Sequence, residues 1–230
     1  MTKIDMKKQD RWLYSGRRGS FDRVRVPEMN FLALEGRGDP NTSRAFARGV
    51  GALFALSYNV KFASKLELGK DYAVMPLEAL WWSDDPSVFV RRHKDEWNWQ
   101  AMIRQPDWVE SSMIDEVMES TVTKINRKRE AATDEATLRS LRLISWEEGD
   151  AVQTLHLGSF DAEGPVIEEL HSRAIPELGA SRTGKHHEIY LSDLRRTPSD
   201  RLRTILRQPV ALAQGGIVPQ GEGDEIDQHA

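Results

Sequence analysis

The chain has 230 residues, no cysteine and a formal net charge of −4, because its 32 Lys and Arg are outnumbered by 36 Asp and Glu. This length suits one domain with a real hydrophobic core, or two small halves. The lack of cysteine excludes disulfides, thiolate metal sites and a cysteine nucleophile, and the acidic balance argues against nucleic-acid binding. Since no run of about 18 apolar residues and no signal-peptide core appears, we expect a cytoplasmic protein that does not bind membranes.

The first half of the chain shows the order strand, helix, strand, strand. After a polar arm over residues 1–27, residues 29–34 predict a strand, and apolar spacing from residue 41 or 42 to about 63 predicts a helix. Residues 72–82 and 96–104 predict two more strands. Five of the seven Trp fall between Trp81 and Trp108, which is typical of a tightly packed sheet or of a wall for flat ligands.

The middle of the chain, about residues 107–146, predicts a helical insertion. Pro106, Asp107 and Glu110 have the spacing of a helix start with a capping box. Apolar residues continue at helical spacing as far as Ile125, and residues 134–144 predict a second, short helix. The basic run over 124–129 is most simply the solvated face of the first helix.

The second half repeats the order of the first. Residues 151–157 predict a strand, 165–178 a helix, 185–192 a strand, and 204–210 a last strand or bridging segment. The sequence therefore predicts an α+β fold built from a duplicated β-α-β-β unit, with repeats at about 29–106 and 150–210. Residues 211–230 have the composition of a disordered tail.

The predicted strand over 185–192 carries the best candidate for chemistry. Alternation places His186, Glu188 and Tyr190 on one face and His187 on the other, so the two histidines cannot share a metal ion. A carboxylate there is either solvated or lies on the floor of a pocket, where it would attract a cation or handle a proton. Aligning the long strands of the two halves sets Glu78 against Glu188, so we expect both carboxylates to meet where the halves join.

Several stretches together resemble the GyrI-like small-molecule-binding family, in particular its stand-alone members that lack a DNA-binding domain. They are PEMNFLALEGRGDPN (27–41), VMPLEALWW (74–82), WNWQAMIRQPD (97–107), EGDAVQTLHLGSF (148–160) and residues 186–210. Departures are Ala79, where the family favours Gly, and Leu194, where SDPRR is usual. The resemblance implies one domain over residues 1–210, a duplicated β-α-β-β (SHS2-type) multidrug-binding fold, and a cleft between the halves.

The resemblance also implies a function. In related ligand-sensing domains a glutamate on a second-half strand meets cationic aromatic drugs, and Glu188 takes the matching place. Some stand-alone relatives are implicated in hydrolysing cyclopropane rings of DNA-alkylating natural products, which protects the cell. Hydrolysis is favoured because a stand-alone domain has no attached output for a sensed ligand. The alternatives are a multidrug-binding or sequestering protein without catalysis, and a gyrase-inhibitor-like module that binds another protein.

The candidate catalytic residues are Glu188, as general base on water, and Tyr190 or Tyr58, as hydrogen-bond donor to the substrate oxygen. The candidate ligand-binding residues are Glu78, Trp82, Trp99, Met102, His156 and Phe160. The chain has no GxSxG, GxxxxGK[ST] or GxGxxG motif. We therefore expect a small-molecule partner, no cofactor and no metal, and either a monomer or a homodimer.

Overall fold

The computed structural model describes residues 2–85, 93–128, 131–193 and 196–213. Its strands are β1 (Asp22–Arg37), β2 (Leu77–Trp82), β3 (Asn98–Gln105), β4 (Arg142–Leu157), β5 (Ala180–Arg182), β6 (His186–Tyr190) and β7 (Arg203–Leu212). Its α-helices are α1 (Met6–Gln9), α2 (Arg44–Glu67), α4 (Ser111–Asn126), α5 (Glu135–Arg139), α6 (Gly164–Glu169) and α7 (Ile175–Glu177). A π-helical segment, η3 (Leu170–Ala174), joins α6 to α7, and short 3₁₀ turns are η1 (Lys94–Glu96), η2 (Phe160–Ala162) and η4 (Ser199–Arg201).

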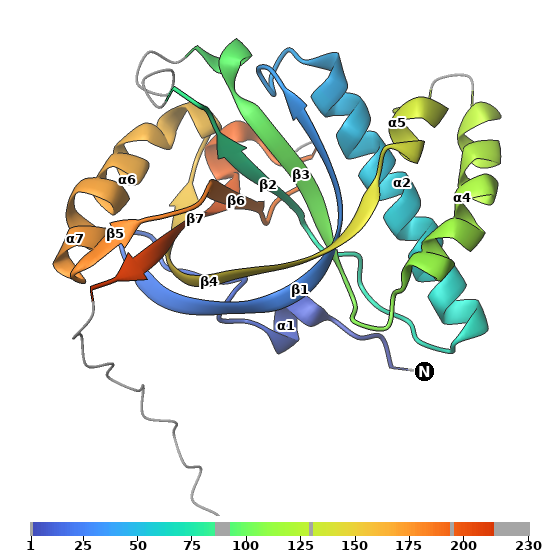
Figure 1. Cartoon of the computed structure of the whole chain (residues 1–230), viewed down its shortest axis with the longest axis horizontal. Helices are drawn as coiled ribbons and strands as arrows, with labels where there is room; N and C mark the ends of the chain where they lie inside the picture. The colour runs from blue at the N-terminus through green and yellow to red at the C-terminus, as the bar shows by residue number, and fades with distance from the viewer. Residues whose placement is uncertain (1, 86–92, 129–130, 194–195, 214–230) are drawn as a thin grey trace, which may run out of the picture.

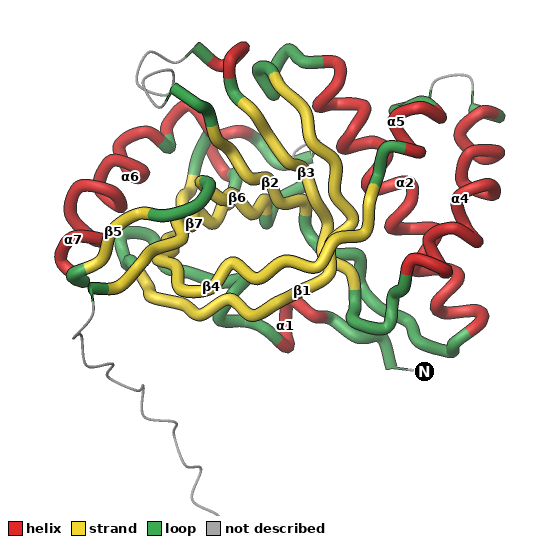
Figure 2. The backbone as a smooth tube through the Cα atoms, viewed as in Figure 1, coloured by secondary structure: helices red, strands yellow, loops and turns green. Residues whose placement is uncertain are grey.

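Six of the strands form a closed antiparallel barrel. They follow the order β4-β1-β3-β2-β6-β7, and pairing of β4 with β7 closes the ring, while β5 adds to the free part of β7. Figure 2 shows these strands curving around one another as yellow tubes. Closure leaves no open sheet edge among the six, apart from the strand ends.

The barrel is built from two similar units, β1-α2-β2-β3 and β4-α6-β6-β7. The units join where β2 pairs with β6 and where β1 pairs with β4. Their helices lie at opposite sides of the barrel in Figure 1, with α2, α4 and α5 at one side and α6 and α7 at the other. The predicted α+β fold with a duplicated β-α-β-β unit is thereby confirmed.

Helix α2 covers the outer face of the first unit. Its N-cap Ser43 accepts a hydrogen bond from the backbone N–H of Phe46, and its buried stripe includes Leu53, Leu56 and Val60. The predicted helix is present, but it begins after Ser43 rather than at residue 41 or 42 and extends to Glu67 rather than to about residue 63. Phe46 packs against Trp81 and Trp99 of β2 and β3, so the face that carries these two tryptophans is the outer, helix-covered face of the barrel.

Several predicted boundaries are wrong. Strand β1 begins at Asp22, inside the predicted arm, and β2 begins at Leu77 rather than residue 72. Glu110 caps α4 without a side-chain hydrogen bond, so the predicted capping box is absent from this turn. Residues 142–146, placed in the helical insertion, belong to β4. Of the predicted tail, 211–213 are described, with 211 and 212 in β7, and residues 214–230 lie outside the described part of the chain.

Candidate functional site

Glu188 lies in the middle of β6, on the strand pair that joins the two units. Its Cα partners are Ala79 of β2 and Leu206 of β7, and its side chain is on the outer face of the barrel. The residue is only 9% exposed. The hydroxyl of Tyr190 donates a hydrogen bond of 2.8 Å to Glu188 Oε2, because residues two apart on a strand share a face.

The surroundings of Glu188 raise the pKa of its carboxyl to about 7. Burial is the largest cause of the rise, and the hydrogen bond from Tyr190 and the charge of His187 oppose it. The indole N–H of Trp81 also opposes the rise, although it makes no hydrogen bond of ordinary geometry. A carboxyl with a pKa near 7 is both available as a base and strong enough to accept a proton at neutral pH.

Aromatic side chains from several elements lie on the same face as this carboxyl. Phe160 of η2 meets the Tyr190 ring edge to face, with centroids 5.5 Å apart. Trp81 pairs with His186 across β2 and β6 and contacts the rings of Phe46 and Trp97 at 5.7 and 5.9 Å. These rings come from both units, so the site is built at their junction.

His186 also lies beside the carboxyl, with Nε2 3.8 Å from Glu188 Oε1. Burial lowers the pKa of His186 to about 3, so its ring is neutral near pH 7 and the contact is not an ion pair. Both ring nitrogens are buried without a hydrogen-bond partner. They are therefore free to bond to a ligand.

A second carboxyl, that of Glu163, lies on the same side of the barrel. Glu163 precedes α6 and is only 3% exposed, and its Oε1 atom has no hydrogen-bond partner. Burial raises the pKa of Glu163 well above the ordinary value, and the negative charge of Glu188 raises it further. The two carboxyls thus interact and do not ionise independently.

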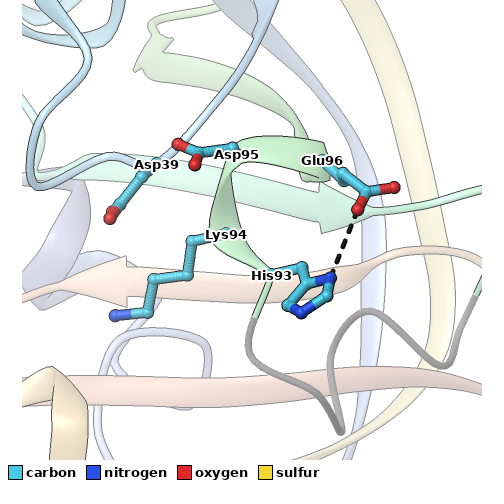
Figure 3. A pocket seen from close by; sticks show the side chains of 5 residues that line it. All are labelled: Asp39, His93, Lys94, Asp95 and Glu96. Carbon is cyan, nitrogen blue, oxygen red and sulfur yellow. Dashed lines mark ion pairs between the residues drawn. The ribbon is translucent and has the colours of Figure 1, made fainter.

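An open pocket of about 420 Å³ is lined by Asp39, His93, Lys94, Asp95 and Glu96 (Figure 3). His93 and Glu96 point toward each other at 3.4 Å, while the Lys94 side chain extends away from them. Lys94 Nζ pairs with Asp161 at 3.1 Å, and its positive charge lowers the pKa of both Glu163 and Glu188. Lys94 therefore connects the pocket electrostatically with the two carboxyls.

The opposite face of the same strands encloses a separate network of buried charges. His187 Nε2 lies 3.0 Å from Glu78 Oε2, and His187 Nδ1 lies 3.0 Å from Glu148 Oε2. Tyr14 donates to Glu78 at 3.1 Å and Arg207 donates to Glu148 at 3.0 Å. Since α2 and α6 cover the outer face, this network fills the barrel interior.

The interior network fixes the charges of its members. Burial alone would lower the pKa of His187, but Glu148 and Glu78 outweigh it and raise that pKa. Burial alone would raise the pKa of Glu148, but His187 and Arg207 bring it down to about 2. The acidic and basic side chains of the network thus lie paired with one another, as buried charges require.

The structure brings some of the sequence-predicted site residues together and separates others. Tyr190 and Phe160 lie with Glu188. His156 lies on the same face of the barrel, and its Nε2 is 3.0 Å from the carbonyl oxygen of Ser159. Trp99 is on the outer face but is 1% exposed and packed against Phe46. The predicted roles of these residues stay predictions.

The expectation that Glu78 and Glu188 converge is wrong. Glu78 pairs with Ile189 rather than Glu188, so its side chain points into the barrel, where His187 and Tyr14 hold it. Met102 pairs with Glu78 and also faces the interior, and it is fully buried.

Two other candidates lie away from the Glu188 cluster. Trp82 alternates with Trp81 and is therefore on the other face, where Lys185 Nζ lies 3.3 Å from its ring centroid. Tyr58 is 51% exposed on α2 and stacks on Phe54, so its hydroxyl has no described contact with the cluster.

Sequence reasoning missed three members of the site: Trp81, Glu163 and Lys94. Trp81 follows from strand alternation once Ala79 is known to pair with Glu188. Glu163 has a usable signal, since it continues the spacing of Ile167, Leu170 and Ala174 on the buried side of the helix. The position of Lys94 depends on the loop that precedes β3 and has no comparable signal.

Within residues 2–85, 93–128, 131–193 and 196–213, no three His, Cys, Asp or Glu side chains are placed to hold a metal ion. In the same part of the chain, no helix is both long enough and apolar enough to cross a membrane.

Comparison with known proteins assigns the chain to a class of small-molecule-binding domains. The model of the GyrI-like small molecule binding domain matches residues 21–211, so the chain belongs to the GyrI-like family. No curated protein matches significantly.

Three solved structures from Listeria innocua resemble this one over 91% of this chain and 100% of each of theirs. One is an uncharacterized conserved protein with 35% identity and a TM-score of 0.80. The other two are hydrolases, one with 34% identity and a TM-score of 0.75, and one encoded by lin2189 with 33% identity and a TM-score of 0.76.

Proposed function

We propose that this protein binds flat aromatic, electrophilic small molecules next to Glu188 and hydrolyses a strained cyclopropane ring in them, in the cytoplasm, as a detoxification or self-resistance activity. The observation that carries the proposal is the Glu188 carboxyl, which is buried among aromatic rings, bonded by Tyr190, and has a pKa near 7. Hydrolase relatives with 33–34% identity support the reaction class.

In the proposed reaction Glu188 acts as general base. It accepts a proton from a water molecule while the water oxygen forms a bond to the ring CH₂ carbon. The strained carbon–carbon bond breaks, and its electron pair moves into the conjugated carbonyl that activates the ring. Tyr190 holds Glu188 Oε2 in place, while the half-buried ring of Phe160 supplies a surface on which a flat ligand can stack.

A second candidate function is that the same residues bind a ligand without catalysing a reaction. Glu188 lies beside aromatic rings, an arrangement that attracts delocalised organic cations through charge and cation–π contacts. A sequestering protein would quench its own tryptophan fluorescence on binding, and the ligand would be recovered intact.

The test is to incubate the protein with a spirocyclopropane alkylator and follow the ring-opened product, heavier by one water, by mass spectrometry. Glu188→Gln should lower turnover by about 10²- to 10⁴-fold. The matched control is Glu168→Gln, which makes the same change at an exposed position on α6 and should keep the wild-type rate. Wild-type turnover in Glu188→Gln would remove Glu188 from the mechanism, and an intact ligand bound by wild-type protein would favour sequestration.

A further inference from the structure

Glu163 occupies a position where the fold calls for an apolar residue. Leu170 and Ala174 are buried and Ile167 is half-buried, and together they form the stripe of the helix that faces the barrel. Glu163 lies four residues before Ile167 and seven before Leu170, so it continues this stripe. A carboxyl at such a position is normally excluded, because burial of an unpaired charge is costly.

Polar side-chain atoms on the outer face near Glu163 make few hydrogen bonds. Thr204 of β7 pairs with Tyr190, and Thr154 of β4 lies on the same outer face. The Thr204 hydroxyl lies close enough to the Glu163 carboxyl to lower its pKa, but neither the two threonine hydroxyl oxygens nor Glu163 Oε1 makes a hydrogen bond of ordinary geometry. Buried polar groups are rarely left without a well-formed hydrogen bond, so the Glu163 carboxyl and the adjoining Thr204 hydroxyl have unused capacity to bond to a polar group.

This polar place is continuous with the Glu188 site. Phe160, three residues before Glu163, contacts the Tyr190 ring, and Tyr190 in turn bonds to Glu188. The charged and titratable groups whose fields reach Glu163 are Glu188 on β6, Lys94 on η1 and Asp161 on η2, and Glu163 itself acts on Tyr190. His156 of β4 lies on the same face, with its ring tied to Ser159.

The two carboxyls differ in how readily they ionise. Burial raises the pKa of both, but Glu188 receives a hydrogen bond from Tyr190 and the field of His187, whereas Glu163 also meets the negative charge of Glu188. Glu188 therefore ionises first and Glu163 keeps its proton at neutral pH. Two carboxyls whose pKa values are separated in this way are typical of a site that contains one general base and one general acid.

We propose that Glu163 is the second catalytic carboxyl of the site and donates the proton that completes the ring opening. This inference rests on the proposed hydrolysis. The proton that leaves the water goes to Glu188, and the oxygen–carbon bond forms as the ring bond breaks. The electron pair reaches the activating carbonyl oxygen, which takes the proton from Glu163. Transfer of the proton from Glu188 to Glu163 then restores the starting state, so the net change is the addition of one water.

The first experiment compares turnover of the spirocyclopropane alkylator by wild type, Glu163→Gln and the exposed control Glu168→Gln between pH 5 and 10. Glutamine keeps the shape of the protonated carboxyl but has no proton to donate. We expect Glu163→Gln to lower kcat by about 10²-fold or more and to remove the alkaline limb of the profile. The affinity for the ring-opened product, measured by tryptophan quenching, should change by less than about threefold, within the range of an uncharged hydrogen-bond exchange.

A second measurement needs no substrate. Infrared spectra of ligand-free wild-type protein at pH 8 should contain the carbonyl band of a protonated carboxylic acid, and Glu163→Gln should lack it. Absence of the band in wild type would overturn the inference, as would wild-type kcat in Glu163→Gln. Loss of the reaction in wild type itself would instead reject the proposed hydrolysis, so the two failures are distinct.

Discussion

Tyr190 partly offsets the effect of burial on the pKa of Glu188 through one hydrogen bond. Its hydroxyl donates to Glu188 Oε2 at 2.8 Å, and this bond favours the charged carboxylate. Tyr190→Phe should therefore raise the pKa of Glu188 further above its present value of about 7. The measurement is an NMR titration of protein with ¹³C-labelled glutamate side chains, in which the Glu188 resonance is identified from Glu188→Gln.

The control for this prediction is Tyr72→Phe. It also removes a buried hydroxyl, but one that donates to Gln105 at 3.2 Å. The Glu188 titration should be the same in this variant as in wild type. A Glu188 midpoint that stays the same or falls in Tyr190→Phe would show that the hydrogen bond does not stabilise the carboxylate.

The sequence predicts which site residues share a face of one strand, but not which residues from other elements pack beside them. Alternation within 185–192 correctly separates His187 from Glu188 and Tyr190, because the side-chain period of a strand is two. Glu78 was misplaced because residue-type alignment of the two halves does not fix which face each residue takes. Glu163 was missed because an acidic residue before a helix is ordinarily a solvated partner of the helix N-terminus.

The interior network joins β2, β4, β6 and β7, so removal of one member leaves charges buried and unpaired. Glu148→Ala would deprive both His187 and Arg207 of their shared carboxylate. We expect this variant to lose about 3–5 kcal/mol of unfolding free energy, the usual effect of breaking a buried ion pair. Urea denaturation followed by tryptophan fluorescence measures the loss.

The neighbouring residue provides a matched control. Glu147 precedes Glu148 on β4, but its side chain is about half exposed, and its partner Arg25 is more exposed still. Glu147→Ala should change the unfolding free energy by less than about 1 kcal/mol, because exposed ion pairs contribute little. Equal losses in the two variants would mean that the strand, and not the buried network, is what the substitutions disturb.

Element types were easier to predict than element ends. The sequence predicts the existence of α2 because its apolar spacing is local, but it places the cap at residue 41 or 42, whereas Ser43 caps the helix. It misassigns residues 142–144 to a helix because Leu138 and Leu141 have helical spacing, whereas pairing of Leu143 with Leu32 on β1 extends the strand. Strand β5 has only three residues and exists through its pairing with β7. Long-range pairing of this kind leaves little trace in local sequence.

At the scale of the whole molecule, closure of the barrel creates two chemically different compartments. Pairing of residues 151–157 with 203–209 brings the first and last strands of the second unit together and closes the ring. The interior then holds charges that balance one another, while the outer face holds the partly ionised pair Glu163 and Glu188. The duplication could be predicted from the repeated order of elements, but the closure could not, because register between distant strands is not encoded locally.

These compartments predict an unusual dependence of stability on pH. Below the ordinary glutamate pKa of 4.5, stability should fall, because Glu148 has a folded-state pKa of about 2 and its contribution is lost as the pH falls toward that value. Above 4.5 the folded protein holds protons on Glu188 and Glu163 that the unfolded chain releases, so stability should decline as the pH rises to about 7 and then to about 10. His187 acts in the same direction, since its pKa is raised and its contribution is lost as the pH rises through the folded-state value.

Buried His186 opposes this decline below pH 6.5, because its folded-state pKa is about 3 and only the unfolded chain takes up that proton. His171, whose folded-state pKa is about 4, acts in the same way. We therefore expect a broad maximum of stability between about pH 4.5 and 6.5, followed by a decline with a slope of about 1.4 kcal/mol per pH unit for each proton released on unfolding. Urea denaturation between pH 3 and 10 measures the profile. Glu163→Gln cannot ionise at this position, so it should gain stability relative to wild type as the pH rises above 7, whereas Glu168→Gln should follow wild type. A wild-type stability that increases steadily from pH 5 to 8 would contradict this prediction. It would mean that Glu163 and Glu188 ionise as freely in the folded protein as in the unfolded chain, and that neither their burial nor their interaction raises their pKa.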